Sequence, residues 1–202
     1  MSLQKKTIIK AGLALLDKEG LDGLTLRKLA ASMNVVASAI YWHIDNRRLL
    51  IDEMAEAILQ EEFADLKPPE GDYVWQDWLI ETMQRLRGAM LAHPDGARVV
   101  AGAHIYPAVT LAAIAETGLI TLTSAGISLD KAHVIMLTCL SFTFGHSIEE
   151  QNSPGAKELE NPEFQKIVND FAKTYPVSMK AIKEDKKSPD ELFVEMLRLI
   201  IY

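Results

Sequence analysis

The stretch LTLRKLAASMNVVASAIYWHIDNRR, residues 24–48, sets the architecture of this chain. Thr25 is a residue type that caps helices, and apolar side chains recur at helical spacing from 26 to 33. Asn34 then favours a tight turn, because asparagine tolerates the left-handed backbone region. A second short helix is expected over residues 37–44. Two short helices joined by such a turn predict a helix-turn-helix.

The same stretch separates an inner from an outer face. The apolar residues expected to form a small core are Leu26, Leu29, Ala30, Val35 and Ile40. The residues expected to face outward are Ala37, Ser38, Ala39, Tyr41 and His43. Small residues let a helix approach base edges closely, and hydroxyl groups can bind phosphates. Arg27, Arg47 and Arg48 flank the second helix, where phosphate contacts are expected, so we predict a surface for double-stranded DNA. Trp42 is left between two alternatives, the core and this surface.

Charge is distributed unevenly along the chain. Residues 1–50 carry eight lysines and arginines against four acidic residues, a surplus of four positive charges. The whole chain has a net charge of −7, so the remainder carries −11. This asymmetry favours contact between the N-terminal part and a polyanion.

The rest of the chain is predicted to be helical. A first helix over residues 7–16 ends near Gly20, and Asn46 caps a long helix that reaches Phe63. Further helices are expected near 73–92, 95–102, 107–124, 128–152, 161–180 and 189–202. Because no useful alternation of period two occurs, we expect no sheet. The predicted fold is all-α, with a three-helix helix-turn-helix domain at 1–48, a helical domain at 49–202 and a connecting helix at 46–66.

Several classes of protein are not expected from this sequence. No apolar stretch has the length of a membrane span and the first residues lack a signal segment, so we expect a cytoplasmic protein without membrane contact. The one cysteine, Cys139, lies in an apolar run and is interpreted as core packing. No nucleophile has a base at catalytic spacing, and Glu149 and Glu150 point about 100° apart around a helix. We therefore expect neither an enzyme nor a cofactor.

Longer motifs resemble the tetracycline-repressor family. The segments GLDGLTLRKLAASMNV and IYWHIDNRRLL, within residues 20–50, are similar to its N-terminal domain. The segments similar to its C-terminal body are YVWQDWL, AMLAHPDGARVV, LSFTFGHSIEEQ and LFVEMLRLII. The resemblance implies a homodimer that binds a palindromic operator, with the helices near 128–152 and 189–202 forming a four-helix bundle with their copies. It also implies a small-molecule effector inside each body, so that residues 49–202 form a ligand-binding and dimerisation domain.

The resemblance places DNA contacts by position. The matching residues are Arg27, Ser38, Ala39, Tyr41, Trp42, His43 and Arg47. Ala37 stands where the family's tetracycline-binding members have a glutamine, so their base preference should not transfer.

The resemblance also places a ligand pocket. The corresponding residues are Phe63, Thr82, Leu86, Val100, His104, Gly118, Phe142 and Glu149. Val100 occupies the position of a magnesium-binding histidine, and valine has no donor for a hard cation, so tetracycline with magnesium is not the expected effector. We expect a hydrophobic or aromatic effector and no metal site.

Alternatives to this interpretation remain at the sequence level. Each pocket residue could be plain core, and a metal site rebuilt from His104, His146 and Glu149 is conceivable. The chain could also be a DNA-binding regulator without an effector, or an activator rather than a repressor.

Overall fold

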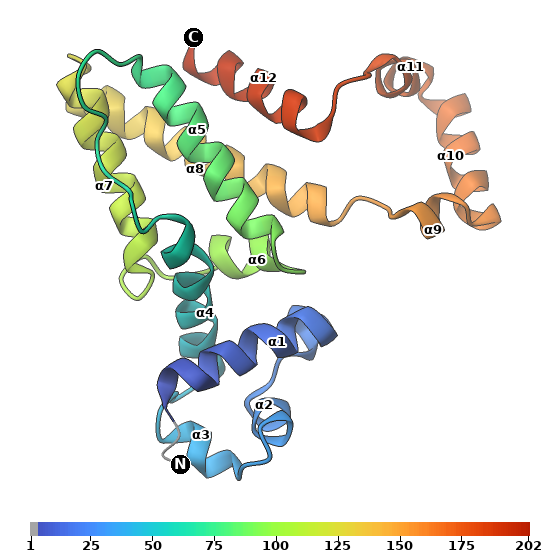
Figure 1. Cartoon of the computed structure of the whole chain (residues 1–202). Helices are drawn as coiled ribbons and strands as arrows, with labels where there is room; N and C mark the ends of the chain where they lie inside the picture. The colour runs from blue at the N-terminus through green and yellow to red at the C-terminus, as the bar shows by residue number, and fades with distance from the viewer. Residues whose placement is uncertain (1–3) are drawn as a thin grey trace.

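The computed structural model describes residues 4–202, and the described chain consists of helices and loops without a strand (Figure 1). The helices are α1 (Lys5–Gly23), α2 (Leu26–Ser32), α3 (Ala37–Tyr41), α4 (Arg47–Glu62), α5 (Trp75–Leu91), α6 (Gly96–Ala101), α7 (Val109–Ser124), α8 (Leu129–Gln151), α9 (Ala156–Leu159), α10 (Pro162–Thr174), α11 (Pro176–Glu184) and α12 (Pro189–Ile201). This confirms the predicted all-α fold with an N-terminal helix-turn-helix. None of the helices in residues 4–202 is long and apolar enough to cross a membrane.

Helices α1–α3 form an N-terminal head that is built from local signals. Gly20, with φ of 70°, breaks α1 near its end. The side chain of Thr25 caps α2 by accepting from the Lys28 amide, and Asn34 has the left-handed φ of 54° that the turn needs. Asn46 caps α4 in the same way as Thr25 caps α2. The two caps and the turn are therefore where the sequence predicts, whereas α1 is longer than the predicted 7–16 and α3 ends at Tyr41 rather than at residue 44.

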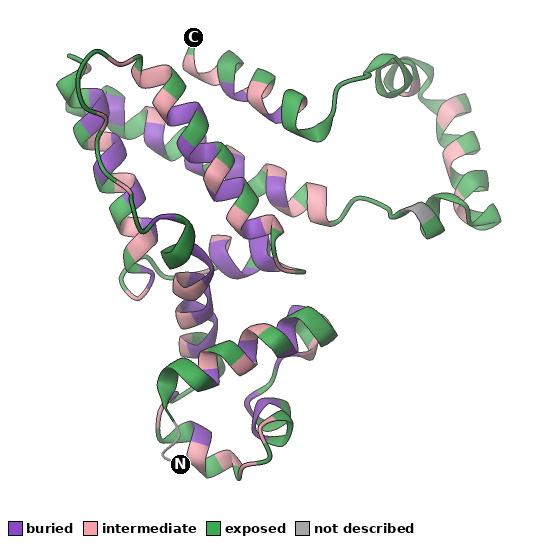
Figure 2. Ribbon diagram, in the orientation of Figure 1, coloured by how far each residue is buried: buried purple, intermediate pink, exposed green. Residues whose placement is uncertain are grey.

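The body packs α5, α6, α7 and α8 around one core, with α12 lying across α5 and α8 (Figures 1 and 2). Buried residues concentrate along the facing sides of these helices, as Figure 2 shows. Cys139 is fully buried there, and burial raises the pKa of its thiol to about 11. The thiol therefore stays protonated at neutral pH and acts as an apolar group.

The prediction of one helix over residues 161–180 is wrong. Pro176 divides this segment into α10 and α11, because proline has no amide hydrogen and its ring clashes with the preceding turn. The short helix α9 was not predicted. The connecting helix α4 also ends at Glu62 rather than at residue 66.

Residues 153–188, which contain α9–α11, form an arm that extends away from the body (Figure 1). Neither α10 nor α11 buries a residue in the described chain. The arm nevertheless exposes large apolar side chains, including Ile167, Phe171 and Ile182. These side chains are therefore left uncovered by the described part of the chain.

A buried arginine ties α5, α8 and α12 together. The guanidinium of Arg87 contacts both carboxylate oxygens of Glu150, at 2.6 and 2.7 Å, and one oxygen of Asp190 at 2.6 Å. The same guanidinium lies over the ring of Phe193 at 5.2 Å. These hydrogen bonds, first of all those to Glu150, raise the pKa of Arg87 above its ordinary value.

A buried carboxylate joins α4 to the loop after α6. Asp52 is 3% exposed and accepts a hydrogen bond of 3.0 Å from the backbone amide of His104. Its carboxylate also lies 3.3 Å from Nε of Arg48, which donates to the carbonyl oxygen of Gly102. Because α4 carries Asp52 and follows directly on the head, this junction fixes the head against the body.

A second junction lies at the end of α1. The backbone amide of Leu21 donates to the Asp95 carboxylate at 2.8 Å, and Nδ1 of His93 lies 2.7 Å from Asp17. Asp95 has a left-handed φ of 58°, which places its side chain toward α1. The head is thus held at two points by the turns on either side of α6.

The Arg87 cluster predicts a difference between two neighbouring glutamates. Glu150→Gln should lower the free energy of unfolding by about 1–3 kcal/mol, because it leaves a buried guanidinium with weaker partners. Glu149→Gln changes an exposed residue and should cost less than about 0.5 kcal/mol. Denaturant unfolding at equal chain concentration measures both, and equal effects would contradict the role given to Glu150.

The Asp52 junction predicts a local change in dynamics. Asp52→Asn keeps the shape but removes the charge, so amide hydrogen exchange should speed up in residues 102–108 and stability should fall by about 1–3 kcal/mol. Asp72→Asn, at an exposed position, serves as the matched control. Unchanged exchange at the His104 amide in Asp52→Asn would show that the junction does not depend on this carboxylate.

Candidate nucleic-acid interface

The orientation of α3 is set by a single side chain. Ile40 is the one buried residue of this five-residue helix and packs into the head core with Leu26 and Leu29. Ser38 and Tyr41 are exposed, and Ala37 and Ala39 are half-buried. The helix therefore presents most of its surface to solvent at the end of the head that lies farthest from the body (Figure 1).

Two large apolar residues beside α3 are exposed. Trp42 is 86% exposed, so the structure places it on the surface rather than in the core, while His43 is half-buried. Val36, the residue before α3, is 70% exposed. Our sequence interpretation did not include Val36 among the site residues. The sequence feature that could have identified Val36 is its position next to Ala37, at the start of the second helix, where side chains reach base edges.

The three arginines assigned to phosphate contacts have different surroundings. Arg27 is exposed on α2 and makes no hydrogen bond or ion pair within residues 4–202. Arg47 donates to the carbonyl oxygens of Leu24 at 2.8 Å and Leu21 at 2.7 Å. Arg48 belongs to the head–body junction described above. Arg27 is thus free to contact a phosphate, whereas Arg47 already bonds within the head and Arg48 bonds to the loop after α6.

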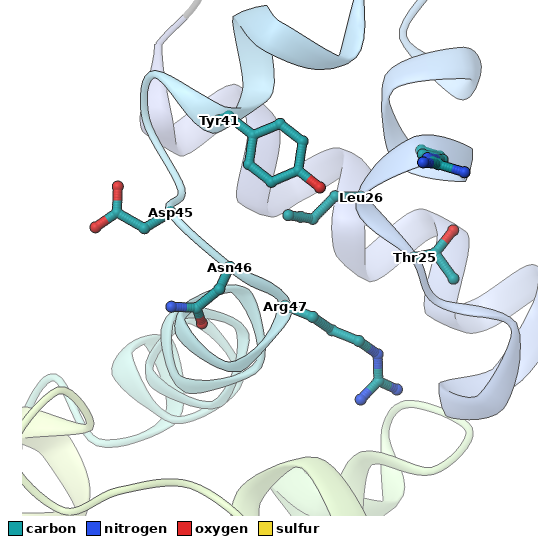
Figure 3. Close-up of a pocket in the computed structure, with 7 residues that line it drawn as sticks. Thr25, Leu26, Tyr41, Asp45, Asn46 and Arg47 are labelled. Atoms are coloured by element: carbon teal, nitrogen blue, oxygen red, sulfur yellow. The ribbon is translucent and has the colours of Figure 1, made fainter.

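A surface groove of about 380 Å³ lies between the start of α2, the end of α3 and the start of α4. It is lined by Thr25, Leu26, Arg27, Tyr41, Asp45, Asn46 and Arg47. Figure 3 shows the Tyr41 ring beside Leu26, with the Arg47 side chain on the other side of the groove. Hydroxyl and guanidinium groups at such a position can bind phosphate oxygens and fix the register of a duplex.

Most residues predicted to line the ligand pocket are buried in the body. Leu86 and Val100 are fully buried, and Phe63 and Thr82 are nearly so. The hydroxyl of Thr82 donates to the carbonyl oxygen of Trp78 at 2.8 Å. Phe63 caps the end of α4, Thr82 and Leu86 lie on α5 and Val100 lies on α6. These three helices pack on one another, so the four residues lie in the same part of the core.

The side chain of Met136 fills the space beside Gly118. A Cβ atom built on Gly118 would lie only 2.4 Å from the sulfur of Met136. The Met136 side chain thus occupies the space that a larger residue would take on α7. Methionine is flexible, so the Met136 side chain can adopt other conformations in this part of the core.

Of the remaining predicted pocket residues, Phe142 on α8 is partly buried against the same hydrophobic core, whereas Glu149 and His104 are exposed. Phe142 stacks on Phe193 with ring centroids 5.5 Å apart and contacts His146 at 5.4 Å. Burial lowers the pKa of His146, against the opposing effect of Glu150. Glu149 is exposed beside a groove of about 330 Å³ between α8 and α12.

His104 does not join His146 and Glu149. It is exposed at the junction with Asp52, and residues 4–202 contain no group of three or more histidine, cysteine or acidic side chains placed to hold a metal ion. The conceivable metal site from these three residues is therefore not formed, because the loop after α6 carries His104 toward α4.

Two family models match this chain, one over the head and the start of α4 and one over the body. The sequence model described as the C-terminal domain of tetracyclin repressor-like proteins matches residues 67–202. The model of bacterial regulatory proteins of the tetR family matches residues 8–54. The tetracycline repressor protein class A from transposon 1721 of Escherichia coli is 41% identical over 149 residues, which cover 74% of this chain and 68% of the relative.

Solved structures agree with these matches. A possible TetR family transcriptional regulator from Streptomyces coelicolor A3(2) superposes with a TM-score of 0.80 at 30% identity, covering 98% of this chain and 96% of its own. BioQ with its natural double-stranded DNA operator gives a TM-score of 0.67 at 27% identity, covering 84% of this chain and 98% of its own. The chain belongs to the tetracycline-repressor family of DNA-binding transcriptional regulators.

Proposed function

We propose that this chain is a cytoplasmic repressor that binds a palindromic operator as a homodimer and is released by a small apolar or aromatic effector. The observation that carries the proposal is the exposure of the outer face of α3, from Ser38 to Trp42, around a single buried anchor, Ile40. BioQ, a related protein, was solved on a double-stranded operator. In the proposed dimer, two copies of α3 lie about 34–36 Å apart and enter successive major grooves.

Helices α8 and α12 supply the proposed dimer interface. Val134 and Leu137 on α8 and Leu199 on α12 are large apolar side chains that one protomer leaves exposed. Such a pair of helices buries its apolar stripes when it packs against its own copy as a four-helix bundle. The exposed apolar side chains of the arm support the same arrangement, because the partner protomer can cover them.

The proposed effector enters the body core between α5, α6 and α7. Phe63, Leu86 and Val100 offer apolar contacts, and Thr82 offers a hydroxyl once it turns from the Trp78 carbonyl. Because the class A relative is a tetracycline repressor, Val100 is the informative difference: it cannot coordinate the cation that a histidine could hold. Met136 is the side chain that has to move, since it fills the space beside Gly118.

The signal would pass along α4. This helix ends near Phe63 in the proposed pocket, carries Asp52 at the junction and begins beside the head. An effector that favours another packing of α4 against α6 would therefore change the separation of the two heads. To move the population from mostly bound to mostly released, it must prefer that packing by about 5.5 kcal/mol.

A second candidate is a DNA-binding regulator that takes no effector. The packed state of the pocket positions favours it, because Met136 fills the space beside Gly118 and Leu86 and Val100 are fully buried. The two candidates share the DNA surface and differ only in the body.

Tyr41 tests the DNA surface. Tyr41→Ala removes a hydroxyl beside the α2–α3–α4 groove and should weaken operator binding by about 1–3 kcal/mol, measured by fluorescence anisotropy with duplex selected from a random library. Tyr106→Ala is the matched control, because Tyr106 is 92% exposed on the body. Equal affinity of both variants for the selected duplex would remove Tyr41 from the interface.

The effector is tested by thermal unfolding against a library of apolar and aromatic compounds. A compound at about 100 times its Kd should stabilise the chain by about 2.7 kcal/mol, and the same compound should release the operator. Gly118→Ala adds a methyl group to the space that Met136 would have to vacate for an effector, and should weaken this stabilisation, whereas Gly88→Ala, at an exposed position on α5, should not. A library without any stabilising compound would favour the regulator without an effector.

A further inference from the structure

The N-terminal tip of α3, residues 36–39, begins with a valine that makes no contact in the core of the head. Val36 is the N-cap residue of α3, is 70% exposed and makes no side-chain hydrogen bond to the helix. N-cap positions favour serine, threonine, asparagine and aspartate, whose oxygens accept an amide hydrogen. In the same head, Thr25 and Asn46 cap α2 and α4 in that way. Val36 therefore contributes neither a cap nor a core contact.

The residues beside Val36 have the same chemistry. Ala37 and Ala39 are half-exposed, and Ser38 is the only residue of 36–39 with a polar side chain. Recognition of a purine edge by a pair of hydrogen bonds requires arginine, lysine, asparagine or glutamine. The first turn of α3 has none of these residues, so its contact with a base pair has to be largely apolar.

Double-stranded DNA offers one apolar group in the major groove. The C5-methyl group of thymine projects there, and apolar side chains recognise it by contact. The positive surplus of residues 1–50 favours a polyanion over an apolar protein surface as the occupant of this tip. The N-terminal end of a recognition helix is also the part that reaches the base edges.

We propose that Val36, flanked by the methyl groups of Ala37 and Ala39, recognises the C5-methyl group of thymine in the major groove of each operator half-site. This inference rests on the proposed function and adds the chemistry by which the operator is selected. Specificity at this position comes from a methyl contact, and the hydrogen bonds come from residues such as Arg27 and Tyr41 elsewhere in the head.

The test compares thymine with uracil, which differs by this methyl group alone. The full chain first selects its duplex from a random library. Each thymine of the half-site is then replaced by deoxyuridine, symmetrically in both halves, and affinity is measured by fluorescence anisotropy. One or two positions should lose affinity by about fourfold per half-site, the value of one buried methyl group.

Variants link this loss to Val36. Val36→Ala should bind the thymine duplex more weakly and should no longer distinguish thymine from uracil at that position. Val74→Ala is the matched control, because Val74 is also an N-cap valine, is 53% exposed and lies before α5 in the body. This control should distinguish the two bases as the unchanged chain does.

The experiment distinguishes a failure of this inference from a failure of the proposed function. If no duplex is enriched, both the proposed function and this inference fall. If a duplex is enriched but uracil is tolerated at every position, or Val36→Ala still distinguishes the two bases, the inference alone is overturned. Circular dichroism melting checks that Val36→Ala remains folded, as expected for an exposed residue.

Discussion

The burial of Ile40 is the constraint on which the DNA-binding surface depends. A helix of five residues has little stability of its own, so α3 exists because Ile40 packs into the core formed with α1 and α2. Once Ile40 points inward, Ser38 and Trp42 point outward, since they lie roughly half a turn away. The same contact holds the tip of α3 away from the body. One apolar side chain thus orients a whole recognition surface.

The two junctions transmit this orientation to the body. Asp52 and Asp95 both accept backbone amide hydrogens from the opposite part of the molecule, at 3.0 and 2.8 Å. Charge-assisted bonds of this kind fix geometry better than apolar packing, because their strength depends on direction. A body that repacks around a ligand would therefore move the head as a unit, with α4 as the connecting element.

Local signals made the head predictable from sequence, whereas the body contacts were not. Thr25, Asn34 and Asn46 each act on neighbouring residues, so their residue types suffice to place the helix ends. The partners of Arg87 and the place of His104 depend on residues distant in sequence, which no periodicity reveals. Pro176 is a local signal as well, and it ends the helical run that the apolar pattern of residues 161–180 predicts as one helix.

Exposure was the hardest property to predict. In a short helix the pattern of apolar residues spans little more than one turn, so it could not decide whether Trp42 is covered. For the body, resemblance supplied positions such as Gly118 but not the filling of the space beside it by Met136. Family likeness therefore predicts where a pocket would lie, while packing decides whether it is open.

The most direct measurement of the central claim is hydroxyl-radical footprinting of the protein, read by mass spectrometry, with and without the selected duplex. The account predicts that oxidation of Tyr41 and Trp42 falls strongly when DNA is bound, while Tyr106, which is exposed on the body, is oxidised as before. Undiminished oxidation of Tyr41 and Trp42 in the saturated complex would contradict the assignment of α3 as the DNA-binding helix.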